Sequence, residues 1–129
     1  MVADSILITG ADGYLGARLA RREAAAEAFW RRIGLAVEWQ TATDPFFEPS
    51  KNPKYLAQKL DPVKREMVFD GRLAIGSSNF HRNYFGEAFE IRRDGAEAFS
   101  GCIAFGIERW IHAILRRYGP DVRGWPVIE

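Results

Sequence analysis

The stretch Gly101-Cys102-Ile103-Ala104-Phe105-Gly106-Ile107-Glu108-Arg109-Trp110 decides the fold, because its first half is typical of a strand and its second half of a helix start. Side chains alternate between the two faces of a strand. Ile103 and Phe105 would therefore form a bulky face, and Cys102, Ala104 and Gly106 a nearly flat one. A flat face lets a planar ligand such as a purine lie close to the backbone. The stretch predicts a strand over residues 101–106 that leads into a helix and leaves room for a ligand beside it.

The helix that follows is predicted from apolar residues at helical spacing. This apolar stripe runs from Ile107 to Tyr118, and Gly119 ends it. Arg109 lies opposite the stripe in the first turn, where backbone amides and the helix dipole favour an anion. Its guanidinium could hold a phosphate bidentately. In the alternative interpretation, the small strand face packs against a helix and Arg109 is a solvated surface residue.

Further short elements are predicted upstream. We expect an amphipathic helix over residues 14–33, ended by Gly34, and a half-buried strand over residues 35–40. Residues 41–64 hold four of the six prolines and are expected to form a loop-rich rim. More strands are expected at residues 65–69, 72–76 and 88–92. Because short connections favour antiparallel pairing, we predict an α+β fold, a mostly antiparallel sheet of about five strands with flanking helices.

Length and composition favour a single globular domain, since the 129 residues are 47% hydrophobic and 27% charged. The formal net charge of +1 gives no overall field that would draw the protein to nucleic acid or to anionic lipid. One cysteine cannot form an intramolecular disulfide. No apolar run approaches the roughly 20 residues of a spanning helix, and no basic leader precedes the apolar residues 5–8. The sequence therefore predicts a cytoplasmic protein that does not bind a membrane.

Several motifs resemble those of class II aminoacyl-tRNA synthetases. Residues 106–110, GIERW, are similar to their motif 3, and residues 77–80, SSNF, resemble the Ser-Asn-Phe stretch of seryl-tRNA synthetases. Three longer patterns look closer still to the amino acid:[carrier protein] ligases, which are seryl-synthetase-like enzymes without a tRNA-binding arm. These patterns are DPFFEP at 44–49, SNFHRNYFGE at 78–87 and FSGC at 99–102. The resemblance covers about residues 21–126, the C-terminal half of such a catalytic domain.

The resemblance implies an activity and a set of site residues. Members of the family activate a small amino acid with ATP and magnesium as an aminoacyl adenylate. They then load it onto the phosphopantetheine of a carrier protein, without tRNA, and they can be homodimers. By this resemblance Gly106 and Arg109 would bind ATP, with Arg109 catalytic. Asn79 would bind the amino acid substrate, and Cys102 would be a zinc ligand.

Other parts of the family pattern are missing from the sequence. Motifs 1 and 2 are not found, nor is the acidic residue before Ser-Asn-Phe that binds magnesium in seryl synthetases. The family's zinc also needs a second cysteine and a glutamate, whereas this chain adds only His81 and His112 to Cys102. A single cysteine commonly fills a core, and His81 is expected in a loop. We therefore expect a truncated or fused derivative that binds nucleotide without full turnover.

The N-terminal glycines suggest a different relationship. Gly10, Gly13 and Gly16 follow an apolar run and resemble the start of short-chain dehydrogenase/epimerase Rossmann domains. There such glycines hold the pyrophosphate of NAD(P) at a helix N-terminus. The simpler alternative is a glycine-rich turn into a helix. The sequence thus predicts two parts, a fused or foreign Rossmann-like segment, residues 1–20, and a partial synthetase-like domain, residues 21–129. Parallel pairing of residues 5–9 with 35–40 would indicate a Rossmann domain.

A row of arginines on the first predicted helix offers a third function. Its members are Arg18, Arg21, Arg22, Arg31 and Arg32. They could contact an acidic partner such as a carrier protein. The alternative is a solvated helix face, because Glu23 and Glu27 are interspersed. The sequence therefore supports three functions: part of an adenylate-forming ligase, a dinucleotide-binding module, or a non-catalytic docking domain.

Overall fold

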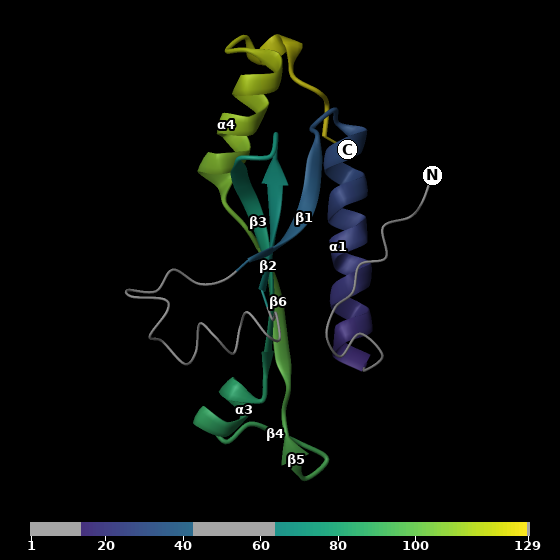
Figure 1. The fold of residues 1–129 in the computed structure, drawn as a ribbon, viewed down its shortest axis with the longest axis vertical. Coiled ribbons are helices and arrows are strands. Elements are labelled where there is room, and N and C mark those ends of the chain that lie inside the picture. Colours follow the sequence, from purple (N-terminus) through teal and green to yellow (C-terminus); the bar gives the residue numbers. More distant parts are fainter. Residues whose placement is uncertain (1–13, 43–63, 129) are drawn as a thin grey trace.

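The computed structural model describes residues 14–42 and 64–128, which form an α+β fold with an antiparallel sheet and flanking helices (Figure 1). A long helix, α1, comes first, and strands and short helices alternate after it. The elements are α1 (Tyr14–Arg32), β1 (Val37–Ala42), β2 (Lys64–Phe69), β3 (Leu73–Arg82), α3 (Tyr84–Ala88), β4 (Arg92–Arg93), β5 (Ala96–Glu97), β6 (Ser100–Phe105), α4 (Ile107–Tyr118) and the 3-10 turn η2 (Val122–Gly124).

The main sheet has four strands in the order β1-β2-β3-β6, and every neighbouring pair is antiparallel. The tight β2–β3 turn uses Asp70 and Gly71, whose φ angles of 52° and 65° are typical of a primed hairpin turn. These features confirm the predicted antiparallel sheet. The strand predicted at residues 88–92 is wrong. Residues 84–88 form α3. A small hairpin follows, in which the two-residue strands β4 and β5 are joined by Asp94 and Gly95.

Strand β3 is longer than the sequence suggested. It was expected to end at Gly76, yet it runs on to Arg82 and pairs with both β2 and β6. The polar residues Ser77, Ser78 and Asn79 therefore lie inside a strand rather than in a loop. The extra length carries β3 and β6 well below the rest of the sheet in Figure 1, where α3 and the hairpin close the lower end.

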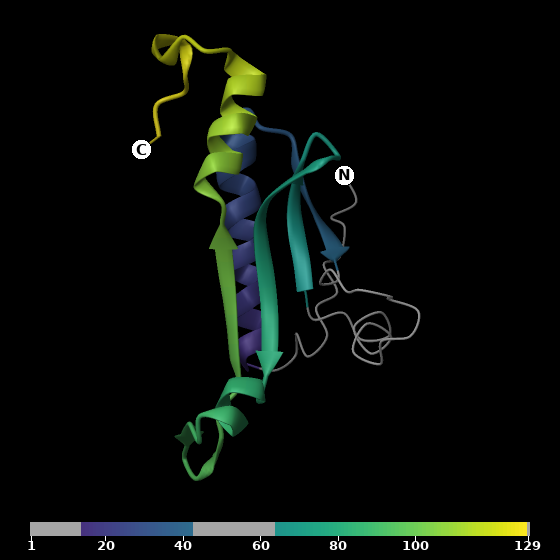
Figure 2. The same ribbon diagram turned by 90° about the vertical axis from the view of Figure 1, so that its left-hand side faces the viewer.

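Helix α1 runs along one face of the sheet and contacts β1, β3 and β6 (Figure 2). The hydrophobic core lies between α1 and the sheet and continues past the end of α1. Its largest side chain is Trp30, which is 2% exposed. Trp30 also meets Trp110 of α4 at 4.5 Å between ring centroids. The other buried members of this core are Ile33, Leu35, Val37, Met67, Phe69, Ile75, Ala113 and Ile114.

A buried ion pair lies beneath α1. Glu23, 1% exposed, contacts the Arg65 guanidinium of β2. Burial raises the pKa of the Glu23 carboxyl, while hydrogen bonds from Ser78 and Arg65 and the Arg65 charge act in the opposite direction. The Trp39 indole donates to the Glu23 carbonyl at 3.0 Å. Helix and sheet are thus joined by polar as well as apolar contacts.

The N-terminal predictions are only partly within the described residues. Gly10, Gly13 and residues 5–9 lie outside them, as do residues 43–63 of the proline-rich rim. Gly16 lies in the first turn of α1 and is buried. Within the described chain β1 pairs only with β2, in antiparallel fashion, and none of the described helices is long and apolar enough to cross a membrane.

Candidate functional site

The sheet face away from α1 carries the predicted site residues. Register places Asn79 opposite Cys102 and Ser77 opposite Ala104, so these four side chains share that face. On the next strand Lys64 and Glu66 lie opposite Asn79 and Ser77. The alternate residues point the other way, where Ser78 and Arg65 meet Glu23 of α1. The open face is therefore polar, with small side chains along β6.

A depression of about 360 Å³ lies on this face where β6 leads into α4. Gly76, Ala104 and Gly106 give it a floor without bulky side chains. Its charged groups are Arg109, Lys64 and Glu66, and the Lys64 Nζ and Glu66 Oε1 atoms are 3.6 Å apart. The remaining lining residues are Ala74, Ile75, Ser77 and Phe105. Two cations beside one carboxylate and a flat floor suit an anionic ligand with a planar part.

Backbone carbonyls of β3 hold the start of α4 in place. Arg109 Nη1 donates to the Ala74 carbonyl at 2.9 Å, and the Trp110 indole donates to the Ile75 carbonyl at 3.0 Å. The Gly106 amide donates to the same Ile75 oxygen at 3.2 Å. We call these three hydrogen bonds the junction clamp. Arg109 is exposed, and its guanidinium has further N–H groups with which to bind a ligand.

The second group of site residues surrounds Cys102. The Cys102 Sγ atom lies 3.7 Å from Asn79 Nδ2 and 3.8 Å from His81 Nε2. His81 Nδ1 is 3.2 Å from the Ser100 hydroxyl. Cys102 is exposed, so the expectation that it fills the core is wrong. The expected loop position of His81 is wrong too, because His81 is part of β3.

The zinc site that the resemblance implied is not assembled by the described residues. Cys102 and His81 supply two donors, while a catalytic zinc normally has three protein ligands. Across residues 14–42 and 64–128 no group of three His, Cys, Asp or Glu side chains could hold a metal ion. His112 lines a different depression, together with Arg116. Within the described ranges Cys102 and His81 therefore do not complete a zinc site.

The structure brings the sequence-predicted residues onto one continuous surface. Gly106 and Arg109 line the depression, and Asn79 and Cys102 are opposite each other further along β3 and β6. The sequence did not point to Lys64 or Glu66, and it placed His81 in a loop rather than beside Cys102 on the sheet. Alternation along β3 from Ser77 through Asn79 to His81 was the available signal for the histidine, but the strand was expected to stop too early. The two β2 residues had no such signal, because they reach the site only through strand pairing.

The sequence is related to known ligases. It is 35% identical over 107 residues to amino acid–[acyl-carrier-protein] ligase 1 of Bradyrhizobium diazoefficiens and 32% identical over 108 residues to ligase 2 of that organism. These matches cover 78% and 79% of this chain. A type-2 serine–tRNA ligase of Methanococcus maripaludis is 31% identical over 113 residues. That match covers 80% of this chain and 22% of the length of the serine–tRNA ligase. The chain spans 33% and 32% of the two Bradyrhizobium ligases, and no family model matches it.

Proposed function

Because this chain is a partial relative of the amino acid–[acyl-carrier-protein] ligases and the type-2 serine–tRNA ligases, we propose that it forms the nucleotide-binding side of a class II synthetase-like ligase. The reaction would join a small amino acid to a carrier protein. The observation that carries the proposal is the position of Arg109, which the junction clamp holds at the rim of a depression with a flat floor. The names of the relatives supply the amino acid and the carrier protein.

In the proposed reaction a carboxylate oxygen of the amino acid attacks the α-phosphorus of ATP, and pyrophosphate leaves. The carrier's phosphopantetheine thiol then attacks the acyl carbon, and AMP leaves. Arg109 binds the triphosphate and offsets the negative charge that develops on its oxygens. Lys64 adds a second positive charge on the same side. Glu66 is a carboxylate of the depression and the candidate ligand for the magnesium ion that accompanies ATP.

The amino acid would lie at the Asn79 end of the same face. The Asn79 amide, next to Cys102 and Ser77, has a carbonyl oxygen that can accept from an ammonium group and an NH₂ that can donate to a carboxylate. The described residues supply too few metal ligands for the family's zinc. We therefore propose that this chain binds nucleotide, and that turnover requires groups from the two thirds of the ligases that it does not span.

A carrier protein would meet the arginines of α1. Arg21 and Arg22 are exposed, as such an interaction needs. Arg31 instead pairs with Glu27 at 2.9 Å, and the Arg32 guanidinium lies 5.7 Å from the Phe29 ring centroid. The proposed docking surface is therefore the middle of α1 rather than the whole row.

Titration with Mg·ATP, followed by tryptophan fluorescence, tests the nucleotide site directly, because Trp110 is next to Arg109. We expect a saturable change in fluorescence. Arg109→Ala should lower the affinity for Mg·ATP at least about tenfold, because the loss of a hydrogen bond to a charged group costs roughly 1.5–3 kcal/mol. Arg116→Ala is the matched control, since Arg116 is an exposed arginine of the same helix away from the depression.

Other outcomes would favour other functions. A response to NAD(P) that Gly13→Val abolishes, with none to ATP, would support the dinucleotide-binding module. No response to either nucleotide would support a docking domain. Amino-acid-dependent pyrophosphate exchange at the rate of a complete ligase would contradict the proposal that this chain binds nucleotide without turnover.

A further inference from the structure

A small pocket of about 150 Å³ lies between the β2–β3 turn and α4, and we call it the turn pocket. Asp70 and Arg72 line it from the turn. His112 and Arg116 line it from successive turns of the helix. The other lining residues are the apolar Phe69 and Leu73. Because the turn pocket shares no lining residue with the proposed nucleotide site, it is a separate candidate for a ligand.

Three of the lining side chains can carry a positive charge, and all three lack a protein partner. Within residues 14–42 and 64–128, the side chains of Arg72, His112 and Arg116 make no ion pair and no hydrogen bond. Two other arginines of α4, Arg109 and Arg117, donate to backbone carbonyls. The N–H groups of the three turn-pocket residues are therefore available to a ligand.

The charges around the turn pocket do not balance. Asp70 supplies a single carboxylate beside two guanidinium groups, and His112 adds a third positive charge whenever it is protonated. Like charges that are held close together repel one another, most strongly where apolar groups displace water. Phe69 and Leu73 are such groups, and Phe69 is buried. A bound anion would offset the repulsion, so the turn pocket is suited to one.

Size and chemistry together indicate a single phosphate group. Pockets for drug-sized ligands usually measure about 300–1,000 Å³. The turn pocket, at about 150 Å³, is too small for a nucleotide and suits a group as small as one phosphate. Guanidinium groups such as those of Arg72 and Arg116 donate pairs of parallel hydrogen bonds to phosphate oxygens. A protonated phosphate oxygen can also donate to the Asp70 carboxylate, which a fully ionised sulfate cannot do.

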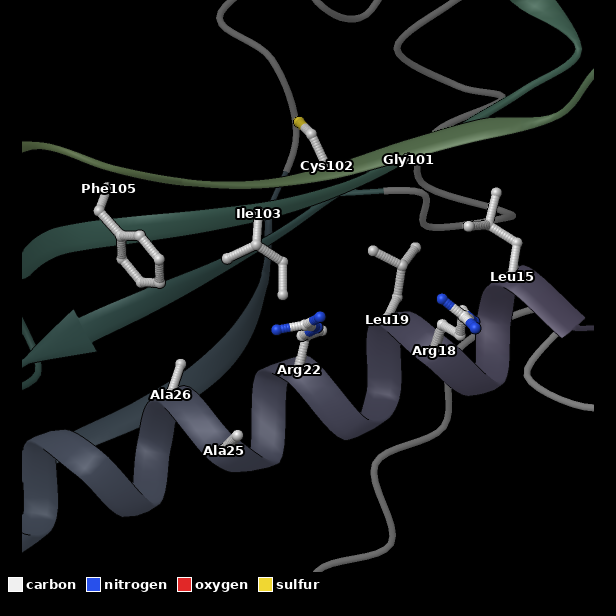
Figure 3. A pocket seen from close by; sticks show the side chains of 10 residues that line it. All are labelled: Leu15, Arg18, Leu19, Arg22, Ala25, Ala26, Gly101, Cys102, Ile103 and Phe105. Carbon is white, nitrogen blue, oxygen red and sulfur yellow. The ribbon is translucent and has the colours of Figure 1, made fainter.

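The groove between α1 and β6 offers a comparison (Figure 3). It measures about 520 Å³ and is also lined by two arginines, Arg18 and Arg22. The side chains around them are mainly apolar and include Leu15, Leu19 and Ile103. Burying a charged group among apolar side chains costs free energy. The turn pocket is therefore the better site for a phosphate, because four of its six lining residues are polar.

We infer that the turn pocket binds a phosphate group, that of inorganic phosphate or of a small phosphate monoester. Arg72 and Arg116 bind its oxygens. His112 donates a further hydrogen bond, and Asp70 accepts one from the protonated oxygen. The inference stands on the turn pocket alone and goes beyond the proposed nucleotide site.

Nuclear magnetic resonance of the histidine rings tests this inference, because the chain has two histidines and His112 is the one that lines the turn pocket. The full chain is titrated with inorganic phosphate at fixed pH and ionic strength. We expect the His112 signal, assigned with His112→Gln, to shift in a saturable way while the His81 signal stays in place. Sulfate should bind at least about tenfold more weakly, because it has no O–H to donate to Asp70.

Three substitutions test the individual contacts. Arg72→Ala and Arg116→Ala should each weaken phosphate binding at least about tenfold, because each removes charged hydrogen bonds. Asp70→Asn should abolish the preference for phosphate over sulfate, and asparagine tolerates the positive φ of this residue. Arg117→Ala is the matched control, since it removes the same charge from the same helix without lining the turn pocket, and it should bind like the wild type.

Thermal melts of each variant separate loss of binding from loss of folding. Titration with glycerol phosphate distinguishes the two sources, since tighter binding than that of inorganic phosphate would assign the site to a monoester and weaker binding to the free ion. No saturable shift of His112 with either compound would overturn the inference. Equal binding by wild type and by folded Arg72→Ala and Arg116→Ala would overturn it too. A His112 response in a protein whose fluorescence ignores Mg·ATP would support this site and count against the nucleotide site.

Discussion

Glu23 of α1 and Arg65 of β2, 42 residues apart in the sequence, form an ion pair that is shielded from solvent by the helix above it. The Glu23 side chain is 1% exposed and the Arg65 side chain 15%. Ser78 of β3 shares the carboxylate, so a single charged group connects the helix to two strands. Breaking a buried pair leaves its remaining charge without compensation.

Removing the Glu23 carboxylate should therefore destabilise the protein. We expect Glu23→Ala to lower the free energy of unfolding by about 3–5 kcal/mol, because Arg65 is left buried without its partner. Glu27→Ala on the same helix is the control. Its pair with Arg31 is partly solvated, and its loss should lower that free energy by no more than about 0.5 kcal/mol. Urea unfolding of the three proteins measures both values, and similar losses in the two variants would contradict the role of the buried pair.

The same carboxyl should make stability depend on pH. Its pKa in the folded protein is raised above its ordinary value of 4.5, chiefly by burial. The folded state therefore holds the proton more tightly than the unfolded chain, and this contribution to stability is fully present below the ordinary pKa. It is lost as pH rises from about 4.5 through the raised pKa. The free energy of unfolding of wild type minus that of Glu23→Gln should fall over this window. A rising or flat difference would show that the pKa is not raised.

Gly34, at the end of α1, should not tolerate a side chain. Its φ is +83°, and a Cβ atom there would overlap the Tyr118 hydroxyl, which donates to the Ile33 carbonyl. Gly71→Ala is the control, since its φ is +65° but a Cβ would meet nothing within 4 Å. We expect about 1 kcal/mol of destabilisation for Gly71→Ala and clearly more for Gly34→Ala. Tyr118→Phe removes the hydroxyl that the new Cβ atom would overlap. In that background Gly34→Ala should therefore destabilise the protein less than it does in the wild type, as measured by thermal unfolding.

The thiol of Cys102 should react in the folded protein. It is exposed on the open sheet face, and Asn79 and His81 lie beside the sulfur. We expect one equivalent of Ellman's reagent to react without denaturant, and none with Cys102→Ser. Reaction only after unfolding would contradict the exposed position. Protection of the thiol by amino acid together with ATP would additionally support the proposed substrate position at Asn79.

Elements with strong local signals could be predicted from the sequence. Helices α1 and α4 follow from apolar residues at helical spacing, and Gly34 and Gly119 end them as expected, both with positive φ. The antiparallel sheet follows from short connections such as the Asp70-Gly71 turn. The predicted apolar stripe on α4 is only partly buried. Ile114 lies in the core, while Ile107 is exposed, because nothing in the described chain covers that side of the helix.

Features that depend on pairing could not be predicted in the same way. The lower half of β3 has serine and asparagine side chains on a face that stays open, so it lacks the apolar alternation by which strands are recognised. The Glu23–Arg65 pair and the positions of Lys64 and Glu66 arise from register between distant segments. The strand predicted at residues 88–92 is wrong because Ala88 is the last residue of α3 and Glu90 has a positive φ of 54°, although an aromatic residue such as Phe89 favours extended backbone.

The junction clamp has a consequence for mutational robustness. All of its acceptors are main-chain carbonyls, at Ala74 and Ile75, so these three hydrogen bonds do not depend on the identity of a β3 side chain. Side-chain changes at the half-exposed Ala74 can accumulate without turning Arg109 away from the depression. A protein built this way can vary the shape and polarity of the floor of this depression while keeping the direction of the Arg109 guanidinium, so the proposed nucleotide site would change its ligand preference more readily than it would be lost.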